Sequence, residues 1–153
     1  GPRQSLRAII PTIISQLLVQ EKKLAIGNLS PKRNFNYIKD TVAGFERACK
    51  SSCFTGEAIN IGGKFEISVK ETIKLVSELM GKNPKISTEI KRKRPKKSEV
   101  YRLVASNVKA KKLLKWQPNY DTRAAFKKAL QETIDWYSDP DNLEKFKLNL
   151  YNL

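Results

Sequence analysis

The sequence predicts an α/β fold, and three observations favour it. Short segments with strand character alternate along the chain with segments of helical periodicity. The 153 residues are 40% hydrophobic, which is enough for a packed core and excludes a compositionally disordered chain. No repeat or long linker divides the sequence, so we expect one domain over residues 1–137 and a polar tail over residues 138–153.

The first element is predicted to be a helix, because apolar residues recur at helical spacing at Leu6, Ile9, Ile10, Ile13, Leu17 and Leu18. Pro11 suits the first turn of a helix, where its missing N–H costs nothing, so the helix should begin near Ile10. Residues 24–26 then form a strand candidate that ends at Gly27.

A second strand is predicted over residues 35–38, followed by a helix with Asp40 as its N-cap. The apolar face of that helix is expected to point into the core, as are the aromatic rings of Phe126 and Trp136 further along the chain. The apolar face of the helix that begins at Asp40 comprises Val42, Phe45, Ala48 and Cys49.

The next elements are a strand at residues 57–61, ended by two glycines, and a helix at residues 69–80. Ser68 and Glu71 form the capping box of that helix, and Gly81 ends it. Residues 85–90 read as an edge strand, and a very basic loop follows at residues 91–97.

Two further helices complete the predicted domain. Ser106 or Asn107 caps a short helix that runs to Leu114. Asp121 or Thr122 caps a longer one through Tyr137, and the Asp139-Pro140 pair breaks the chain after it.

The composition limits the possible chemistry. With no histidine, Ser-His catalytic triads and most metal sites are excluded. No apolar stretch is long enough to span a membrane. Cys49 and Cys53 are expected to be reduced thiols of a cytoplasmic protein. The net charge of +15 favours phosphate-bearing partners but does not separate nucleic acid from a nucleotide ligand.

The order of several short motifs over residues 1–137 is informative. In sequence order these are Gly1-Pro2-Arg3-Gln4-Ser5, Ile10-Pro11-Thr12-Ile13-Ile14, Gly27, residues 33–41 (RNFNYIKDT), Ile59-Asn60-Ile61-Gly62, Arg94-Pro95, Ser98-Glu99-Val100, Leu113-Leu114 and Trp116-Gln117-Pro118. The series resembles the C-terminal half of the extended short-chain dehydrogenases, above all the NAD-dependent nucleotide-sugar 4,6-dehydratases and epimerases.

This resemblance implies the substrate-binding part of an extended Rossmann-type fold, a small mixed sheet with flanking helices that lacks the N-terminal Rossmann half. The family's G-x-x-G-x-x-G phosphate loop and its Tyr-x-x-x-Lys pair do not occur in the sequence. In the complete enzyme NAD(P) would be held mainly by the missing half. We therefore expect no bound cofactor, no catalytic residue and no activity in this chain alone.

The resemblance also assigns binding residues. Arg33 matches the arginine that contacts the diphosphate or the ribose of the nucleotide, and Arg94 matches the second diphosphate arginine. A guanidinium suits bidentate pairing with phosphate oxygens. Leu24 and Ile26 match the segment beside the base, and Pro11 lies on the helix that walls the pocket. Glu99 and Arg102 either contact the sugar or pair with each other. The basic loop around Arg94 is otherwise expected to be solvated.

The chain departs from the family pattern at two positions. Asn34 replaces the usual aspartate and removes a negative charge beside Arg33. Lys115 replaces a glycine at a position that often needs a left-handed backbone, which costs lysine about 1 kcal/mol.

The resulting hypothesis is that the chain is the nucleotide-sugar-binding portion of a dehydratase or epimerase. Its expected partners are a nucleoside diphosphate sugar and either the missing half or further copies of the chain, with no membrane. One alternative is a non-catalytic module that binds nucleotide sugars or phosphate. The other is a basic nucleic-acid-binding protein, which the lack of interleaved aromatic residues in the loop disfavours.

Overall fold

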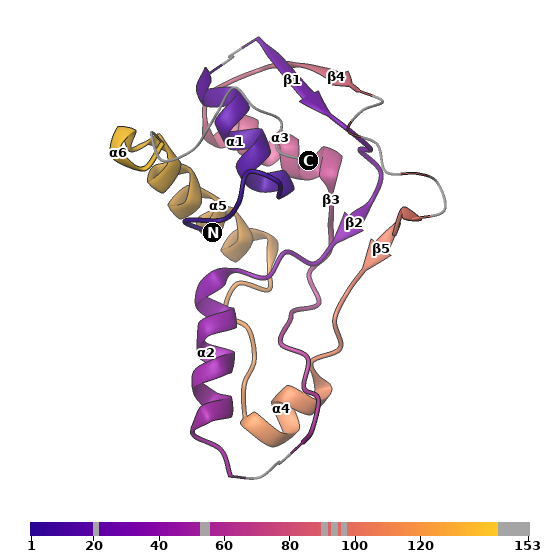
Figure 1. Cartoon of the computed structure of the whole chain (residues 1–153), viewed down its shortest axis with the longest axis vertical. Coiled ribbons are helices and arrows are strands. Elements are labelled where there is room, and N and C mark those ends of the chain that lie inside the picture. Colours follow the sequence, from indigo (N-terminus) through magenta and orange to yellow (C-terminus); the bar gives the residue numbers. More distant parts are fainter. Residues whose placement is uncertain (20–21, 53–55, 90–91, 93–94, 96–97, 144–153) are drawn as a thin grey trace.

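The computed structural model describes residues 1–19, 22–52, 56–89, 92, 95 and 98–143 (Figure 1). The helices are α1 (Ile9–Val19), α2 (Ile38–Cys49), α3 (Val69–Leu79), α4 (Val108–Leu114), α5 (Arg123–Ser138) and α6 (Pro140–Leu143). The strands are β1 (Lys23–Ile26), β2 (Lys32–Arg33), β3 (Ile67–Ser68), β4 (Lys85–Thr88) and β5 (Arg102–Leu103).

The strands form two small sheets. In one, β1 pairs with β4 in parallel. In the other, β2 lies between β3, which is antiparallel to it, and β5, which is parallel to it. The predicted α/β class with a small mixed sheet and flanking helices is therefore confirmed.

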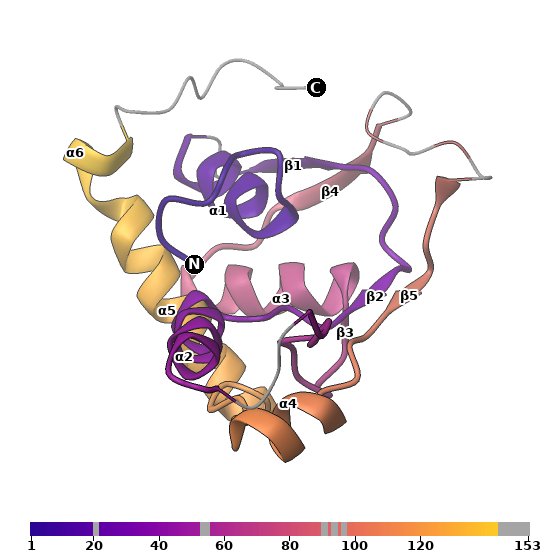
Figure 2. The ribbon, with the colours of Figure 1, turned by 60° about the horizontal axis from the view of Figure 1, so that its bottom comes forward.

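The molecule has two regions that are packed differently (Figure 1). In the helical core region, α1, α3 and α5 enclose a cluster that includes Ile13, Ile14, Leu17, Val76 and Tyr137. In the α2–α4 region the buried cluster is much smaller and consists of Ala110, Leu114 and Trp116. Figure 2 shows α2 nearly end-on beside α5, with α4 at the lower edge of the view.

Local sequence signals account for several of the helix ends. Ser68 and Glu71 form the expected capping box, since the Ser68 hydroxyl accepts from the Glu71 amide and the Glu71 carboxylate accepts from the Ser68 amide. Thr122 caps α5 by accepting a hydrogen bond from the Ala125 amide. Lys115, after α4, has φ of 52°, the left-handed conformation predicted from its position.

Asp40 is not the N-cap of α2, as the sequence had suggested. The N-cap is Tyr37, whose side chain makes no capping bond, and Asp40 lies in the first turn. Its buried carboxylate instead accepts hydrogen bonds from the amides of Asn119 and Tyr120, at 2.8 and 2.9 Å. The indole N–H of Trp116 donates to the Asp40 carbonyl. Asp40 thus fastens the chain after α4 to α2.

Two strand predictions are wrong. Residues 35–38 contain no strand, because the paired residues are Lys32 and Arg33 and α2 already begins at Ile38. Residues 57–61 are not assigned to a strand, because no neighbouring strand of the described chain pairs with them. Of the last predicted strand, β4 covers Lys85–Thr88, and Ile90 lies outside the described residues.

The orientation of α2 was also predicted wrongly. Phe45 is 65% exposed, Val42 and Cys49 are exposed as well, and the helix buries Asp40 and Gly44 instead. By contrast, Phe126 is buried in the core and Trp136 packs against it, as expected. None of the helices in the described part of the chain is long and apolar enough to cross a membrane.

Candidate functional site

A cavity of about 560 Å³ lies between the start of α1, the end of β1 and β2. Its lining combines apolar side chains with guanidinium, amide and carboxylate groups. The residues are Arg7, Ala8, Ile9, Thr12, Ala25, Ile26, Gly27, Asn28, Pro31, Arg33, Asn34, Phe35, Val69, Arg92, Pro95 and Glu99. A concave site with a few converging polar groups is typical of ligand binding.

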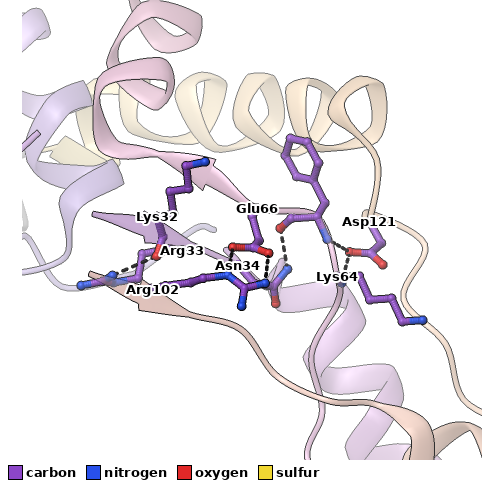
Figure 3. Close-up of polar contacts among 8 residues, drawn as sticks. Lys32, Arg33, Asn34, Lys64, Glu66, Arg102 and Asp121 are labelled. Carbon is purple, nitrogen blue, oxygen red and sulfur yellow. Dashed lines mark hydrogen bonds and ion pairs between the residues drawn. The ribbon is translucent and has the colours of Figure 1, made fainter. Parts of the chain in front are cut away.

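Arg33 lies on β2 at the wall of this cavity. The Nη1 group of Arg33 donates a hydrogen bond to the carbonyl oxygen of Lys32, with 2.9 Å between the two atoms (Figure 3). This bond holds the guanidinium beside its own strand. The side chain is 20% exposed. Most of its donors therefore remain available to a ligand in the cavity.

Glu99 faces Arg33 across the cavity wall. Its Oε1 lies 3.6 Å from Nη2 of Arg33, close enough for an ion pair but longer than a good hydrogen bond. Its Oε2 accepts a long hydrogen bond of 3.4 Å from the Asn28 side chain. The carboxylate is 8% exposed, so it orients Arg33 from a buried position without saturating its donors.

Arg102 does not join this group. It is the register partner of Lys32 on β2, and Arg33 pairs instead with Leu103. Because side chains alternate across a sheet, Arg102 and Arg33 lie on opposite faces, and their guanidinium groups point in opposite directions in Figure 3. Arg102 binds Glu66 through two bonds of 2.5 and 2.7 Å, and this pairing lowers the pKa of the Glu66 carboxyl. Glu99 and Arg102 are therefore not paired with each other.

The other expected binding residues are dispersed. Ile26 lines the cavity, whereas Leu24, two residues earlier on the same face of β1, is buried in the core. Pro11 is buried in the first turn of α1 and is not among the cavity residues. Arg94 lies outside the described residues.

Three cavity residues with guanidinium or amide side chains were not singled out from the sequence. Arg7 precedes α1, Asn28 follows β1, and Arg92 belongs to the basic loop, which was interpreted as solvated. Arg92 is held by a 2.9 Å bond to Glu89. Neither Arg7 nor Asn28 belongs to a distinctive motif, and Arg92 stands in a run of basic residues, so no sequence signal distinguishes them.

Asn34 connects the site to the loop beside it. Its side chain donates to the carbonyl of Phe65 and accepts from the amide of Gly63, both at 3.0 Å. Asp121 accepts from the amides of Lys64 and Phe65 on the other side of the same loop (Figure 3). A Cβ on Gly63 would lie 2.1 Å from an oxygen of Asp121, so glycine is required there.

The described residues contain neither a cluster of metal ligands nor a glycine-rich phosphate loop. No cluster of acidic or cysteine ligands occurs in this part of the chain. At the N-terminus of α3, the amides of Val69 and Lys70 donate to backbone carbonyls, and the amide of Glu71 is bound in the capping box. The Glu71 carboxylate there would also repel a phosphate. No glycine-rich loop precedes α1.

The charges of the cavity favour an anionic ligand. Arg7, Arg33 and Arg92 contribute three positive charges, against one negative charge of Glu99 beside Arg33 and one of Glu89, which pairs with Arg92. Guanidinium groups bind phosphate oxygens through paired hydrogen bonds. The apolar part, formed by Ile9, Ile26 and others, can receive a base or a sugar ring.

Comparison with known proteins identifies the family. Residues 1–129 match the model for the family described as GDP-mannose 4,6 dehydratase. The chain belongs to this family. The matched part contains Arg33 and every residue that lines the cavity.

Relatives of the chain are nucleotide-sugar enzymes. The human dTDP-D-glucose 4,6-dehydratase is 30% identical over 144 residues, covering 91% of this chain and 39% of that protein. The UDP-glucuronate 4-epimerase of Thermodesulfobacterium geofontis is 32% identical over 136 residues, covering 85% and 37%. The chain thus spans about two fifths of the length of these relatives.

Solved structures agree with these relatives. The UDP-glucuronic acid 4-epimerase from Bacillus cereus, in complex with UDP-glucuronic acid and NAD, has a TM-score of 0.74 at 28% identity. The match covers 90% of this chain and 42% of the epimerase. The dTDP-glucose 4,6-dehydratase from Bacillus anthracis, in complex with NAD, has a TM-score of 0.74 at 25% identity, covering 92% and 42%.

Proposed function

We propose that this chain is the substrate-binding portion of a nucleotide-sugar 4,6-dehydratase or 4-epimerase. In this role the cavity beside Arg33 holds a nucleoside diphosphate sugar. The observation that carries the proposal is the position of Arg33, which lines a cavity of about 560 Å³ in a chain of this family. The expectation that Arg94 adds a second diphosphate contact comes from the family resemblance.

In the proposed complex the diphosphate lies against Arg33, with Arg7 and Arg92 adding positive charge around it. Arg33 is already fixed by the Lys32 carbonyl and by Glu99, so it loses little side-chain freedom when a ligand binds. The base and the sugar would occupy the apolar part of the cavity, beside Ile9 and Ile26.

NAD and the acid–base residues belong, in this proposal, to the part of the related proteins that has no counterpart here. This chain then contributes binding and orientation of the substrate, and by itself it does not turn the nucleotide sugar over. Turnover of dTDP-glucose or UDP-glucuronic acid by the purified chain with added NAD would contradict this division of roles.

Calorimetric titration tests the binding role. Replacing Arg33 with alanine should weaken binding of UDP-glucuronic acid or dTDP-glucose by about 1.5–3 kcal/mol, roughly 10- to 150-fold, because a charge-assisted hydrogen bond is lost. Arg102→Ala is the matched control, since this arginine lies on the neighbouring strand but outside the cavity. It should leave the affinity nearly unchanged.

Two further outcomes would overturn the proposal. If Arg33→Ala and Arg102→Ala weaken binding equally, the basic surface attracts the ligand as a whole and the cavity is not the site. The same conclusion follows if the effect of Arg33→Ala disappears when salt is added, because salt screens exposed charges much more than partly buried contacts.

A further inference from the structure

One side of the short helix α4 carries a row of exposed lysines. Lys111 and Lys112 follow the exposed Val108 by three and four residues, so these side chains share one side of the helix. Lys115, directly after α4, donates a hydrogen bond from Nζ to the carbonyl of Lys112 at 3.2 Å, so its side chain lies back along the helix. Lys111, Lys112 and Lys115 form the lysine stripe. The opposite side of α4 is buried against α2.

The positive charge of the lysine stripe is not neutralised by neighbouring carboxylates. The sequence has no acidic residue between Glu99 and Asp121. Within the described chain, Lys111 and Lys112 form no ion pair, and the carboxylate that reaches α4, Glu57, is bound to Lys109. Like charges three and four positions apart repel one another along a helix. A partner that supplies negative charge would therefore relieve this repulsion.

Lys115 adds its charge to the stripe at the expense of backbone strain. Its φ of 52° is the left-handed conformation, which glycine adopts freely and lysine does not. Glycine at this position would end α4 equally well but would leave the stripe one positive charge short. Non-glycine residues held in this conformation occur preferentially at functional sites.

The end of α2 extends the positive surface. Ala48, in the last turn of α2, packs against the buried cluster of α4, so this turn lies beside α4. Arg47 and Lys50 are exposed there, together with one acidic residue, Glu46. In Figure 1 this end of α2 and α4 lie at the bottom of the molecule, whereas α1 and β1, which border the cavity, lie at the top.

We propose that the lysine stripe, with Arg47 and Lys50 beside it, binds the phosphate backbone of double-stranded nucleic acid without reading its sequence. Lysines commonly contact backbone phosphates, and such contacts carry no sequence information. The stripe contains no aromatic side chain on which unpaired bases could stack, which favours a duplex over a single strand.

Other anionic partners fit this surface less well. Lysine is depleted in the cores of protein–protein interfaces, which disfavours an acidic protein. The apolar side of α4 is buried against α2, so the helix has no apolar face to insert into an anionic membrane. The closely spaced phosphates of a duplex need only the positive charges that the stripe presents.

This surface is separate from the proposed nucleotide-sugar site. No residue of α4 lines the cavity, and the basic loop at residues 91–97 takes no part in the proposal. The inference therefore does not depend on the proposed function. A nucleotide sugar has only two phosphates, so it should bind the stripe far more weakly than a duplex does.

Fluorescence anisotropy with a short labelled duplex of mixed sequence, as DNA and as RNA, tests the proposal. The dissociation constant of the whole chain is measured from about 50 to 200 mM salt. Lys111→Gln combined with Lys112→Gln should weaken binding at the lowest salt by at least about tenfold. It should also reduce the slope of log K against log salt for DNA by about 1.8, because each phosphate contact contributes about 0.9.

The matched control is Lys127→Gln combined with Lys128→Gln. These two exposed lysines are also adjacent, but they lie on α5, which Figure 1 shows well apart from α4. The control removes the same charge and should change the affinity by less than about threefold, because salt screens distant charges. Equal losses in the two double variants would overturn the proposal, since net charge alone would then explain binding.

Lys115→Gly separates binding from folding. Glycine relieves the left-handed strain, so this variant should melt at a higher temperature than the wild type. It should nevertheless bind the duplex several-fold more weakly, with the slope for DNA reduced by about 0.9. Unchanged affinity in this variant would contradict the proposal. The nucleic-acid assignment would also be wrong if the wild type binds phosphatidylserine vesicles but neither duplex.

Discussion

Helices α1 and α2 are of similar length and both contain a regular apolar repeat, yet they use it in opposite ways. In α1 the large residues Ile13, Ile14 and Leu17 are completely buried against other helices of the chain. In α2 the large residues face solvent, and the buried face consists of Asp40 and Gly44. The comparison shows that a helical apolar repeat does not by itself decide whether that face of the helix is buried within the chain.

The largest effect is expected in the helical core region. Leu17→Ala removes a completely buried side chain and leaves a cavity, so it should lower the free energy of unfolding by about 2–5 kcal/mol. Val19→Ala on the same helix is the control, because Val19 is 49% exposed and its truncation should cost less than about 0.5 kcal/mol. Urea unfolding measures both. Similar losses in the two variants would show that α1 is not packed as described.

In the α2–α4 region the largest effect should come from a polar residue. Asp40→Ala removes the acceptor for the amides of Asn119 and Tyr120 and should cost about 1.5–3 kcal/mol. Asp40→Asn keeps one acceptor oxygen and should cost less. If the two variants are equally stable in urea unfolding, the hydrogen bonds from the amides of Asn119 and Tyr120 to Asp40 do not stabilise this region.

The attachment between the two regions should depend on pH. Glu132 on α5 accepts hydrogen bonds from Lys39 at 2.6 Å and from the Tyr37 hydroxyl at 2.7 Å, and these bonds lower its carboxyl pKa. The unfolded chain then binds more protons than the folded one at acidic pH. The stabilisation is complete above the ordinary pKa of 4.5 and is lost as the pH falls through the lower folded value.

Thermal melts across this range provide the measurement. The melting temperature of the wild-type protein should fall more steeply below pH 4.5 than that of Glu132→Gln, which has no carboxyl group to protonate. Glu46→Gln on α2 is the control, because Glu46 is exposed, and it should keep the wild-type slope. Parallel curves for Glu132→Gln and the wild type would show that this contact does not join the regions.

The smallest effect is expected for Phe45→Ala in the chain alone. An aromatic side chain that is 65% exposed makes few contacts, so the change in the free energy of unfolding should stay below about 0.5 kcal/mol. A loss of more than about 2 kcal/mol in urea unfolding would mean that Phe45 is buried in solution, and the contrast between the two helices would be wrong.

Sequence reasoning was reliable where the signal is local. The Ser68 and Glu71 capping box, the Thr122 cap and the left-handed backbone of Lys115 depend only on neighbouring residues, and all three occur in the structure. The family could be inferred because the order of its motifs is preserved along the chain.

Where contacts are distant, the sequence was insufficient. A strand at residues 57–61 needs a pairing strand, which the described chain does not provide, and the burial of an α2 face depends on what packs against it. The local pattern encodes neither. The position of Arg102 depends on strand register, because one residue along β5 decides which face of the sheet a side chain occupies. Arg7, Asn28 and Arg92 reach the cavity only through the arrangement of α1, β1 and the basic loop.

The proposed cavity function can be tested most directly by nuclear magnetic resonance. The isotope-labelled chain is titrated with UDP-glucuronic acid, and the backbone amide shifts are mapped onto the structure. The largest changes in backbone amide shift should occur at four residues that line the cavity, Gly27, Asn28, Arg33 and Asn34. Shifts centred on the lysine-rich helix α4, or spread evenly over the basic surface, would contradict it.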